Sequence, residues 1–301
     1  LSVDMDYLLS VMSVATTASA LPEGDSLRRF VHAPAGALVV ASLRESAVFE
    51  AKHGNTDSVV MIDSWRGRQR CTMDDYTRVA LRLGSPALMA TMADLPAPGP
   101  SAKRVRRSVE RTARFERQLK ERTSAAAAPP LLSVVFGHSP EAAAASADNA
   151  AADSGRAGVL LCGFDVTTQE GQSALASVFE RLPESLLRVM LGMRSAEETR
   201  AAIQLGVDIV DSTYCSQEAE LGRALQFSEH TAAHVPAVSL WETRFAKDTG
   251  PLAPGCDCRA CARHSCAYVH HLLNTHELLA SVLLTAYERH SGLSFELTRW
   301  L

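Results

Sequence analysis

The chain has 301 residues, 47% of them hydrophobic, and a formal net charge of −4. This length and composition support one large α/β domain or two smaller ones with a sizeable core. A net charge of −4 excludes a global attraction to nucleic acid, so any such binding requires a local basic patch. No apolar run approaches the roughly 18 residues that predict a membrane span. The first residues lack the basic region of a signal peptide, and seven cysteines, four of them close together near the C-terminus, indicate a reducing compartment.

Short apolar runs alternate with helical patterns along the first 211 residues. Runs rich in Val, Leu and Met predict strands buried on both faces at residues 37–43, 58–63, 87–92, 131–136, 158–164, 187–193 and 207–211. The spacing of apolar residues predicts helices at residues 73–83, 102–122, 140–151, 169–181 and 195–205. This alternation favours a parallel sheet.

Seven strands in this arrangement suggest an α/β fold of the (β/α)8 TIM barrel type, whose first strand lies in the start of the chain or is missing. An open, doubly wound sheet is the alternative. We expect residues 1–235 to form the barrel. Residues 236–301 are expected to form a C-terminal subdomain with a long helix that closes onto the barrel.

The predicted helix at residues 102–122 is unusually basic. Residues 101–122 contain nine Lys or Arg and three Glu, which is a local excess of six positive charges on an acidic chain. Helical spacing places four arginines on one face, namely Arg104, Arg107, Arg111 and Arg114. This face is either a solvated helix surface or a stripe that contacts the phosphates of RNA.

The most informative motif is Cys256-Asp-Cys258-Arg-Ala-Cys261, which precedes a predicted long helix over residues 268–290. Three thiols this close together fit three corners of a tetrahedral Zn²⁺ site, with a histidine of the helix as the fourth ligand. Such a closed site is structural and joins a loop to a helix. Unliganded thiols are one alternative. An iron–sulfur cluster with Cys266 as its fourth cysteine is another, although Cys266 is more simply a small residue that enters the helix.

Several segments together resemble the tRNA-guanine transglycosylase family. The strongest is the cysteine motif with the sequence AYVHHL at residues 267–272 and ELL at residues 277–279. Further similarity lies at residues 103–115, 158–164, 187–199 and 206–211. The resemblance implies a (β/α)8 barrel with a zinc-bearing insertion near the C-terminus. In catalytic members it also implies an aspartate that attacks the tRNA ribose.

The chain departs from this family at the reactive positions. The nucleophile motif Asp-Cys-x-x-Pro-Thr-Arg reads Asp211-Ser-Thr-Tyr-Cys-Ser-Gln here, so the carboxylate is kept and the arginine, a phosphate clamp, is lost. The family's Gly-Gly-Leu turn at the base edge looks like Cys162-Gly163-Phe164, and Asp94 is the nearest candidate for the base-recognition aspartate. The family's pocket motif, Asp-Ser-Gly-Gly-Phe-Gln, is matched only weakly, at residues 63–67.

These losses are similar to those of the family's non-catalytic subunits. The resemblance therefore implies an accessory subunit of a heterodimer that exchanges guanine for queuine at the tRNA wobble position. Its partner would be the catalytic subunit of queuine tRNA-ribosyltransferase, and its own roles would be dimerisation and tRNA positioning. One Zn²⁺ per chain and a cytoplasmic location, peripheral to the mitochondrial outer membrane, are also implied.

The fourth metal ligand and the function leave alternatives open. Counted without gaps, the family's histidine ligand falls on Tyr287, and His290 lies one helical turn further on. We predict the ligand set Cys256, Cys258, Cys261 and His290, with His271, His276 or water as alternatives to His290. The alternative functions are an active transglycosylase that uses Asp211 as its nucleophile and a zinc-stabilised RNA-binding scaffold. Asp211 is equally compatible with a capping role.

Overall fold

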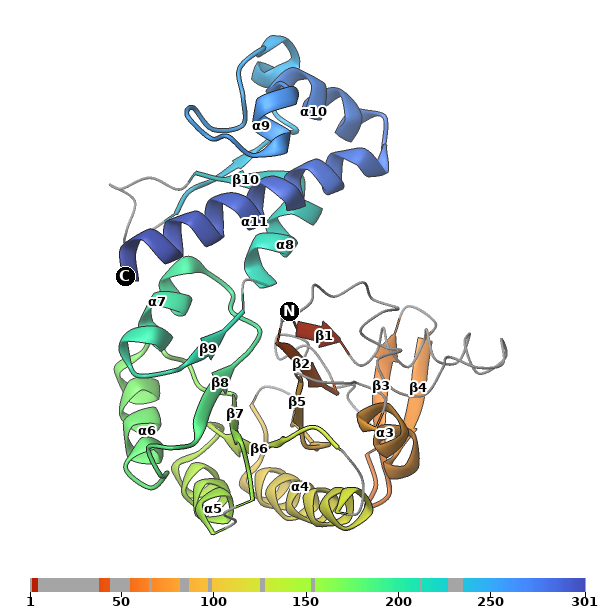
Figure 1. The fold of residues 1–301 in the computed structure, drawn as a ribbon, viewed down its shortest axis with the longest axis vertical. Helices are drawn as coiled ribbons and strands as arrows, with labels where there is room; N and C mark the ends of the chain where they lie inside the picture. The colour runs from red at the N-terminus through yellow and green to blue at the C-terminus, as the bar shows by residue number, and fades with distance from the viewer. Residues whose placement is uncertain are drawn as a thin grey trace. The chain divides into compact units, whose positions relative to one another are not determined.

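The computed structural model describes residues 2–4, 38–43, 55–64, 67–81, 87–96, 99–124, 128–152, 155–211, 213–226 and 235–300. The chain divides into two compact units (Figure 1). The sheet unit comprises Leu1–Leu191 and Ala202–Asp211, and the cysteine unit comprises Gly192–Ala201 and Ser212–Leu301.

The sheet unit is built on seven parallel strands that follow one another in chain order, β1-β2-β5-β6-β7-β8-β9. They are β1 (Ser2–Asp4), β2 (Val39–Ser42), β5 (Ala87–Ala90), β6 (Leu131–Phe136), β7 (Gly158–Cys162), β8 (Leu187–Met190) and β9 (Ile209–Val210). A doubly wound sheet reverses its strand order at a switch point, and this sheet does not. The prediction of an α/β protein with a parallel sheet is confirmed. In the described residues the sheet curls into a half-barrel with β1 and β9 at its edges, and a closed eight-stranded barrel stays a prediction.

One predicted strand lies elsewhere. The segment expected at residues 58–63 is β3 (Val59–Ser64), which pairs antiparallel with β4 (Gly67–Thr72) in a separate two-stranded sheet. Sequence analysis missed β4 because three of its six residues are Arg or Gln and no apolar run marks it. The parallel sheet closes over the gap, because β2 pairs directly with β5, and its seventh strand is β1, which lies in the start of the chain and pairs with the other side of β2.

The helices of the sheet unit begin at clear capping residues. They are α3 (Met73–Ala80), α4 (Ala102–Thr123), α5 (Pro140–Ala151), α6 (Gln169–Phe179) and α7 (Ala196–Gln204), the last shared with the cysteine unit. Ser101, Ser139 and Thr168 cap α4, α5 and α6, each through a side-chain oxygen that accepts a backbone N–H. These three helices lie side by side on one face of the curled sheet (Figure 1). The buried core joins apolar residues of α4 to those of β2, β5, β6, β7 and β8.

The cysteine unit contains a small hairpin and several short helices. Its elements are α8 (Thr213–Glu220), β10 (Arg223–Leu225), β11 (Ala237–Ser239), the 3-10 helix η1 (Thr243–Lys247), α9 (Arg259–Arg263), α10 (Cys266–Asn274) and α11 (Leu278–Trp300). β10 and β11 pair antiparallel. A second apolar core, which includes Cys258, Leu284 and Tyr287, holds these elements together.

The prediction of one long helix at residues 268–290 is wrong, because the structure divides this segment between two helices, α10 and α11. His276 has a φ of 55°, the left-handed conformation. The N–H groups of His276 and Glu277 return to the carbonyls of Leu273 and Leu272, the pattern of a Schellman helix end. Glycine usually occupies this left-handed position at a helix end. Because a histidine occupies it here, the sequence does not indicate that the helix ends. Among the described residues no helix has the length and apolar character to cross a membrane.

Candidate metal centre and the mouth of the sheet

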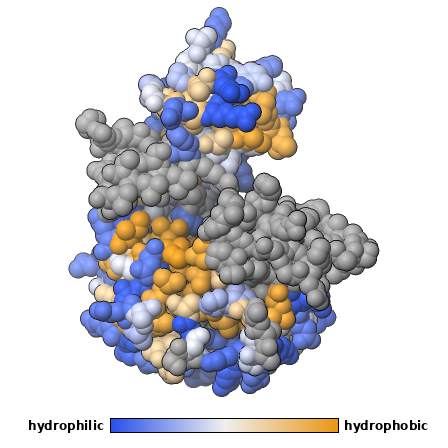
Figure 2. All heavy atoms as spheres, viewed as in Figure 1, coloured by the Kyte–Doolittle hydropathy of each residue, from blue (hydrophilic) through white to orange (hydrophobic). Residues whose placement is uncertain are grey.

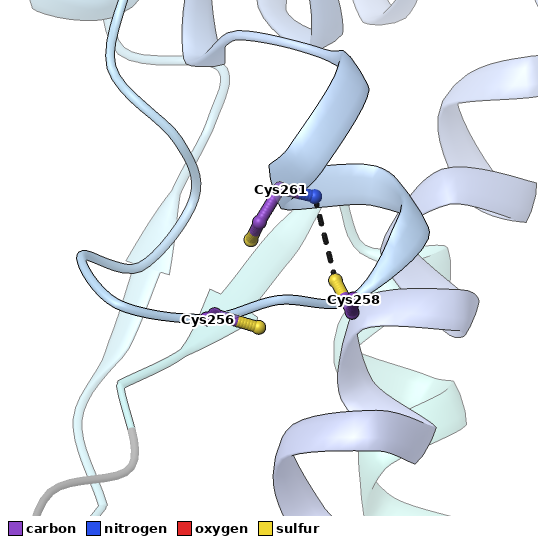
Figure 3. Close-up of side chains that lie close together, drawn as sticks. All are labelled: Cys256, Cys258 and Cys261. Atoms are coloured by element: carbon purple, nitrogen blue, oxygen red, sulfur yellow. Dashed lines mark hydrogen bonds between the residues drawn. The ribbon is translucent and has the colours of Figure 1, made fainter.

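The three cysteines of the predicted zinc motif lie together in the cysteine unit (Figure 3). Their sulfur atoms all lie within 4.8 Å of one another. Cys258 caps α9, because its Sγ accepts the backbone N–H of Cys261 at 3.4 Å. Cys258 is buried, while Cys256 and Cys261 are partly exposed. The loop and the first turn of α9 thus bring three donor atoms to one point.

The electrostatics of this cluster favour a bound cation. Burial first, and then the neighbouring thiols of Cys256 and Cys258, raise the pKa of the Cys261 thiol to about 12. The pKa of Cys256 is also raised, mainly by burial. Three crowded thiols therefore do not ionise together unless a cation balances their charge, and a coordinating metal deprotonates its thiols. Three thiolate donors suit Zn²⁺, and these residues could hold it.

The candidates for the fourth ligand lie elsewhere. The Nε2 of His290 lies 2.8 Å from the Oδ1 of Asp257, the residue between the first two cysteines, and His290 is not in the group of donor atoms within 4.8 Å. His271 is exposed, and the ring of His276 packs against Trp241 with centroids 6.3 Å apart. Cys266 is the first residue of α10, where its Sγ donates to the carbonyl of Pro251.

Tyr287, on which the family's histidine ligand falls, has another role. Its side chain is fully buried, and its hydroxyl donates to the carbonyl of Leu225 at 2.5 Å. The next residue, Glu288, accepts the N–H of the same leucine at 2.7 Å. Helix α11 therefore satisfies both backbone groups of Leu225 at the end of β10, and Tyr287 joins the helix to the hairpin.

Asp94, the candidate base-recognition residue, is held by an ion-pair network in the sheet unit. Its carboxylate is fully buried and accepts from both terminal nitrogens of Arg104 at 2.7 and 2.9 Å. Arg111 donates at 2.5 Å and the amide of Asn55 at 2.7 Å. Burial raises the pKa of Asp94, but Arg104 and Arg111 outweigh it and hold the pKa below its usual value. The carboxylate is ionised and its oxygens are engaged.

The same network accounts for three of the four arginines predicted to contact RNA. Arg104 and Arg111 bind Asp94, while Arg111 and Arg114 bind Asp57, an exposed carboxylate. Arg107 is exposed on α4. Sequence reasoning missed Asn55 and Asp57 because they lie 39 and 57 residues from their partners Asp94 and Arg114, and no local pattern joins them.

The other candidate residues of the sheet unit lie at the carboxyl ends of its strands. Asp211 directly follows β9 and is partly exposed. The turn Cys162-Gly163-Phe164 follows β7, and Gly163 has a φ of +77°. The ring of His138 covers this turn so closely that a Cβ on Gly163 would lie 2.4 Å from its Cε1. Burial, and then the charge of Arg104, lowers the pKa of His138. His138 was not singled out by the sequence.

A small cavity lies in the described part of the sheet unit, near the carboxyl ends of the strands. A cavity of about 20 Å³ is lined by Ser42, Leu43, Ala90, Thr91, Ala93, Leu95, Val134, Leu160 and Cys162. These residues belong to β2, β5, β6 and β7 and to the loops that follow β2 and β5. The volume suits about one water molecule. The hydroxyl of Thr91 is buried there without a partner in the described part of the chain, so a single water would satisfy it.

A curled parallel sheet followed by a three-cysteine loop defines a barrel-type α/β protein with a C-terminal metal-binding candidate. Residues 11–290 match the family model described as queuine tRNA-ribosyltransferase, and the chain belongs to this family. The resemblance drawn from the sequence is thereby confirmed.

The relatives carry a more specific name, queuine tRNA-ribosyltransferase accessory subunit 2. The protein of Anopheles gambiae is 31% identical over 247 residues, which cover 76% of this chain and 57% of that protein. Those of Drosophila pseudoobscura pseudoobscura and Drosophila grimshawi are 29% and 30% identical, over 86% and 90% of this chain and 65% and 68% of theirs. The chain thus spans between 57% and 68% of the length of these relatives.

Proposed function

We propose that this chain is an accessory subunit of a heterodimeric queuine tRNA-ribosyltransferase. It would pair with a catalytic subunit and help to position tRNA, while the exchange of guanine for queuine takes place in the partner. The names of its relatives and its family support this role. The proposal includes a closed (β/α)8 barrel over residues 1–235, a zinc-binding subdomain over residues 236–301, and a cytoplasmic location peripheral to the mitochondrial outer membrane.

The observation that carries the proposal is the occupied mouth of the sheet. Recognition of a purine-like base requires free donors and acceptors and room for the ring. The oxygens of Asp94 are engaged by two arginines and an amide. His138 covers the turn at Gly163, and the adjacent cavity suits one water. These three features argue against a base pocket in the described part of the sheet unit.

An exposed apolar surface supports pairing with another protein. Leu278, Leu279 and Val282 lie at the start of α11 with 78%, 41% and 53% of their surfaces exposed. Figure 2 shows apolar side chains gathered at the turn between α10 and α11. Contiguous exposed apolar residues of this kind mark protein–protein contact surfaces. We assign this surface to the contact with the catalytic subunit.

The test mixes the purified chain with the catalytic subunit and measures incorporation of labelled guanine or queuine into tRNA. We expect a heterodimer on gel filtration, with base exchange that neither protein alone performs. Leu278→Asp combined with Val282→Asp should abolish the complex, because each would bury a charge in an apolar contact. Lys247→Asp, which changes the charge by the same amount at an exposed position of η1, is the matched control. Failure of the wild-type chain to form a complex would refute the proposal.

A second candidate function is catalysis by this chain itself. It is favoured by the position of Asp211, a carboxylate at the carboxyl end of a parallel strand, where the reactive groups of barrel enzymes lie. A covalent tRNA adduct on the isolated chain, lost in Asp211→Ala, would establish this function and refute the accessory role. Binding of RNA without any affinity for the catalytic subunit would instead indicate the zinc-stabilised RNA-binding scaffold.

A further inference from the structure

We propose that the metal centre of this chain holds its cation with three thiolates and leaves a fourth coordination position open to an exchangeable ligand. The centre would then differ from a closed structural site, in which four protein side chains complete the tetrahedron. The inference concerns the coordination chemistry of the cysteine unit and does not depend on the role of the chain in tRNA modification.

The first argument is the count of donors. Among the described residues, the group of His, Cys, Asp and Glu donor atoms within 4.8 Å contains Cys256, Cys258 and Cys261 and no fourth member. The histidines around the loop are engaged elsewhere. His264 stacks on Tyr268 with ring centroids 5.3 Å apart, and the Nδ1 of His270 lies 2.8 Å from the carbonyl oxygen of Leu240.

The second argument is the residue at the position of the missing ligand. A histidine is expected there, and Tyr287 is present. A neutral phenol with an ordinary pKa near 10 is a poor ligand compared with imidazole, thiolate or carboxylate. The Tyr287 hydroxyl also donates to the carbonyl of Leu225, which would lose this donor within the buried core if the ring turned toward the metal. A buried carbonyl without a hydrogen-bond partner destabilises the fold, so this turn of the ring is disfavoured.

The third argument concerns His290. Its Nε2 lies within hydrogen-bond distance of the carboxylate of Asp257, whose backbone lies between two of the cysteines. This pair joins α11 to the cysteine loop from outside the thiol group. His290 thus positions the loop, and the place of a fourth ligand is left to a molecule from solution. Cys256 and Cys261 are partly exposed, so a small donor can reach the centre.

The charge of the centre indicates the class of ligand. Three thiolates and one divalent cation give a net charge of −1, which disfavours a further anion and favours a neutral donor. Water would occupy the position in buffer, and a neutral imidazole would displace it because nitrogen is a better ligand for this class of metal. We therefore expect the open position to bind added imidazole.

The test uses the full chain reconstituted with Co²⁺, whose visible absorption reports the ligands and geometry of a zinc site. We expect one Co²⁺ per chain, thiolate charge-transfer bands, and a saturable shift of the visible bands on titration with imidazole. Zinc X-ray absorption should give three sulfur neighbours and one lighter neighbour. No shift in the wild-type chain, or less than one metal per chain, would overturn the inference.

Three variants identify the source of the fourth ligand. His290→Ala should keep the imidazole response of the wild-type chain. If instead it acquires a response that the wild-type chain lacks, His290 was the ligand and the inference fails. Tyr287→His should abolish the response by supplying an imidazole, whereas Tyr287→Phe, which loses the same hydroxyl without adding a donor, should retain it. A full response in a folded Tyr287→His chain would contradict the placement of the open position beside α11. If Tyr287→His does not fold, the wild-type chain and His290→Ala decide.

Discussion

The network around Asp94 yields a quantitative prediction. Asp94→Asn keeps the shape of the side chain but removes the charge that Arg104 and Arg111 share. Their side chains are 31% and 10% exposed, so both guanidinium groups would stay largely buried without their main carboxylate. Breaking a buried ion pair by removing one partner costs about 3–5 kcal/mol. Because Arg111 keeps Asp57 and Arg104 keeps some contact with solvent, we expect about 3 kcal/mol.

The assay is urea unfolding followed by circular dichroism. With a slope of about 2–3 kcal/mol/M, a loss of about 3 kcal/mol lowers the midpoint by about 1–1.5 M. Asp57→Asn is the matched control, because Asp57 binds Arg111 and Arg114 but is 61% exposed. Solvent screens such a carboxylate, so its loss should move the midpoint several-fold less. Equal midpoints for Asp94→Asn and the wild-type chain would refute the reasoning.

The pH dependence checks the sign of the effect. The pKa of Asp94 is lower in the folded chain than its ordinary value of 3.8. A depressed pKa contributes stability above the unfolded pKa, and this contribution is lost as the pH falls through the folded pKa. The difference in stability between the wild-type chain and Asp94→Asn should therefore stay constant from pH 8 to pH 6. It should shrink below about pH 4, and a difference that grows on acidification would contradict the network.

Three further outcomes are expected. Gly163→Ala should lower the free energy of unfolding by about 2 kcal/mol in the same urea assay, because the added Cβ meets the His138 ring and the backbone is left-handed; an unchanged midpoint would show that the ring moves freely. Cys258→Ser should lose bound zinc, measured by atomic absorption, and should also lose thermal stability. Cys266→Ser is the control and should retain the zinc, and equal loss in both variants would make Cys266 a ligand. Arg107→Gln should weaken tRNA binding and reduce the slope of log K against log salt by about 1, and an unchanged slope would remove α4 from the RNA contact.

The sequence predicted the periodic parts of the sheet unit well, because buried parallel strands and amphipathic helices leave strong local patterns. The helix Pro140–Ala151 and the strand Leu131–Phe136 have the predicted bounds. The cysteine cluster was equally accessible, since three donors within six residues are a local signal. The hairpin strand Gly67–Thr72 was missed because its residues are mostly polar, and its pairing with β3 is a contact that no local pattern indicates.

The environment of the candidate site residues was less predictable because it depends on contacts distant in sequence. The basic face of α4 looked available for RNA, but Asp94 and Asp57 approach it from other segments. The end of α10 at His276 could not be predicted from the sequence, because a histidine occupies the left-handed position that glycine usually occupies. Leu279 lies beyond this helix break and is exposed, whereas Leu272 before the break is buried.

The order of strands in the large sheet has a consequence for which segments set its register. Each strand pairs with the next one along the chain, except that β2 pairs with β5 and skips the hairpin β3–β4 and α3. The register of β2 and β5, with Val40 opposite Leu88, does not involve the skipped segment. Residues 59–80 thus do not set the alignment of β2 with β5, although the buried Tyr76 hydroxyl donates to the carbonyl of Ala90 and so joins α3 to the large sheet.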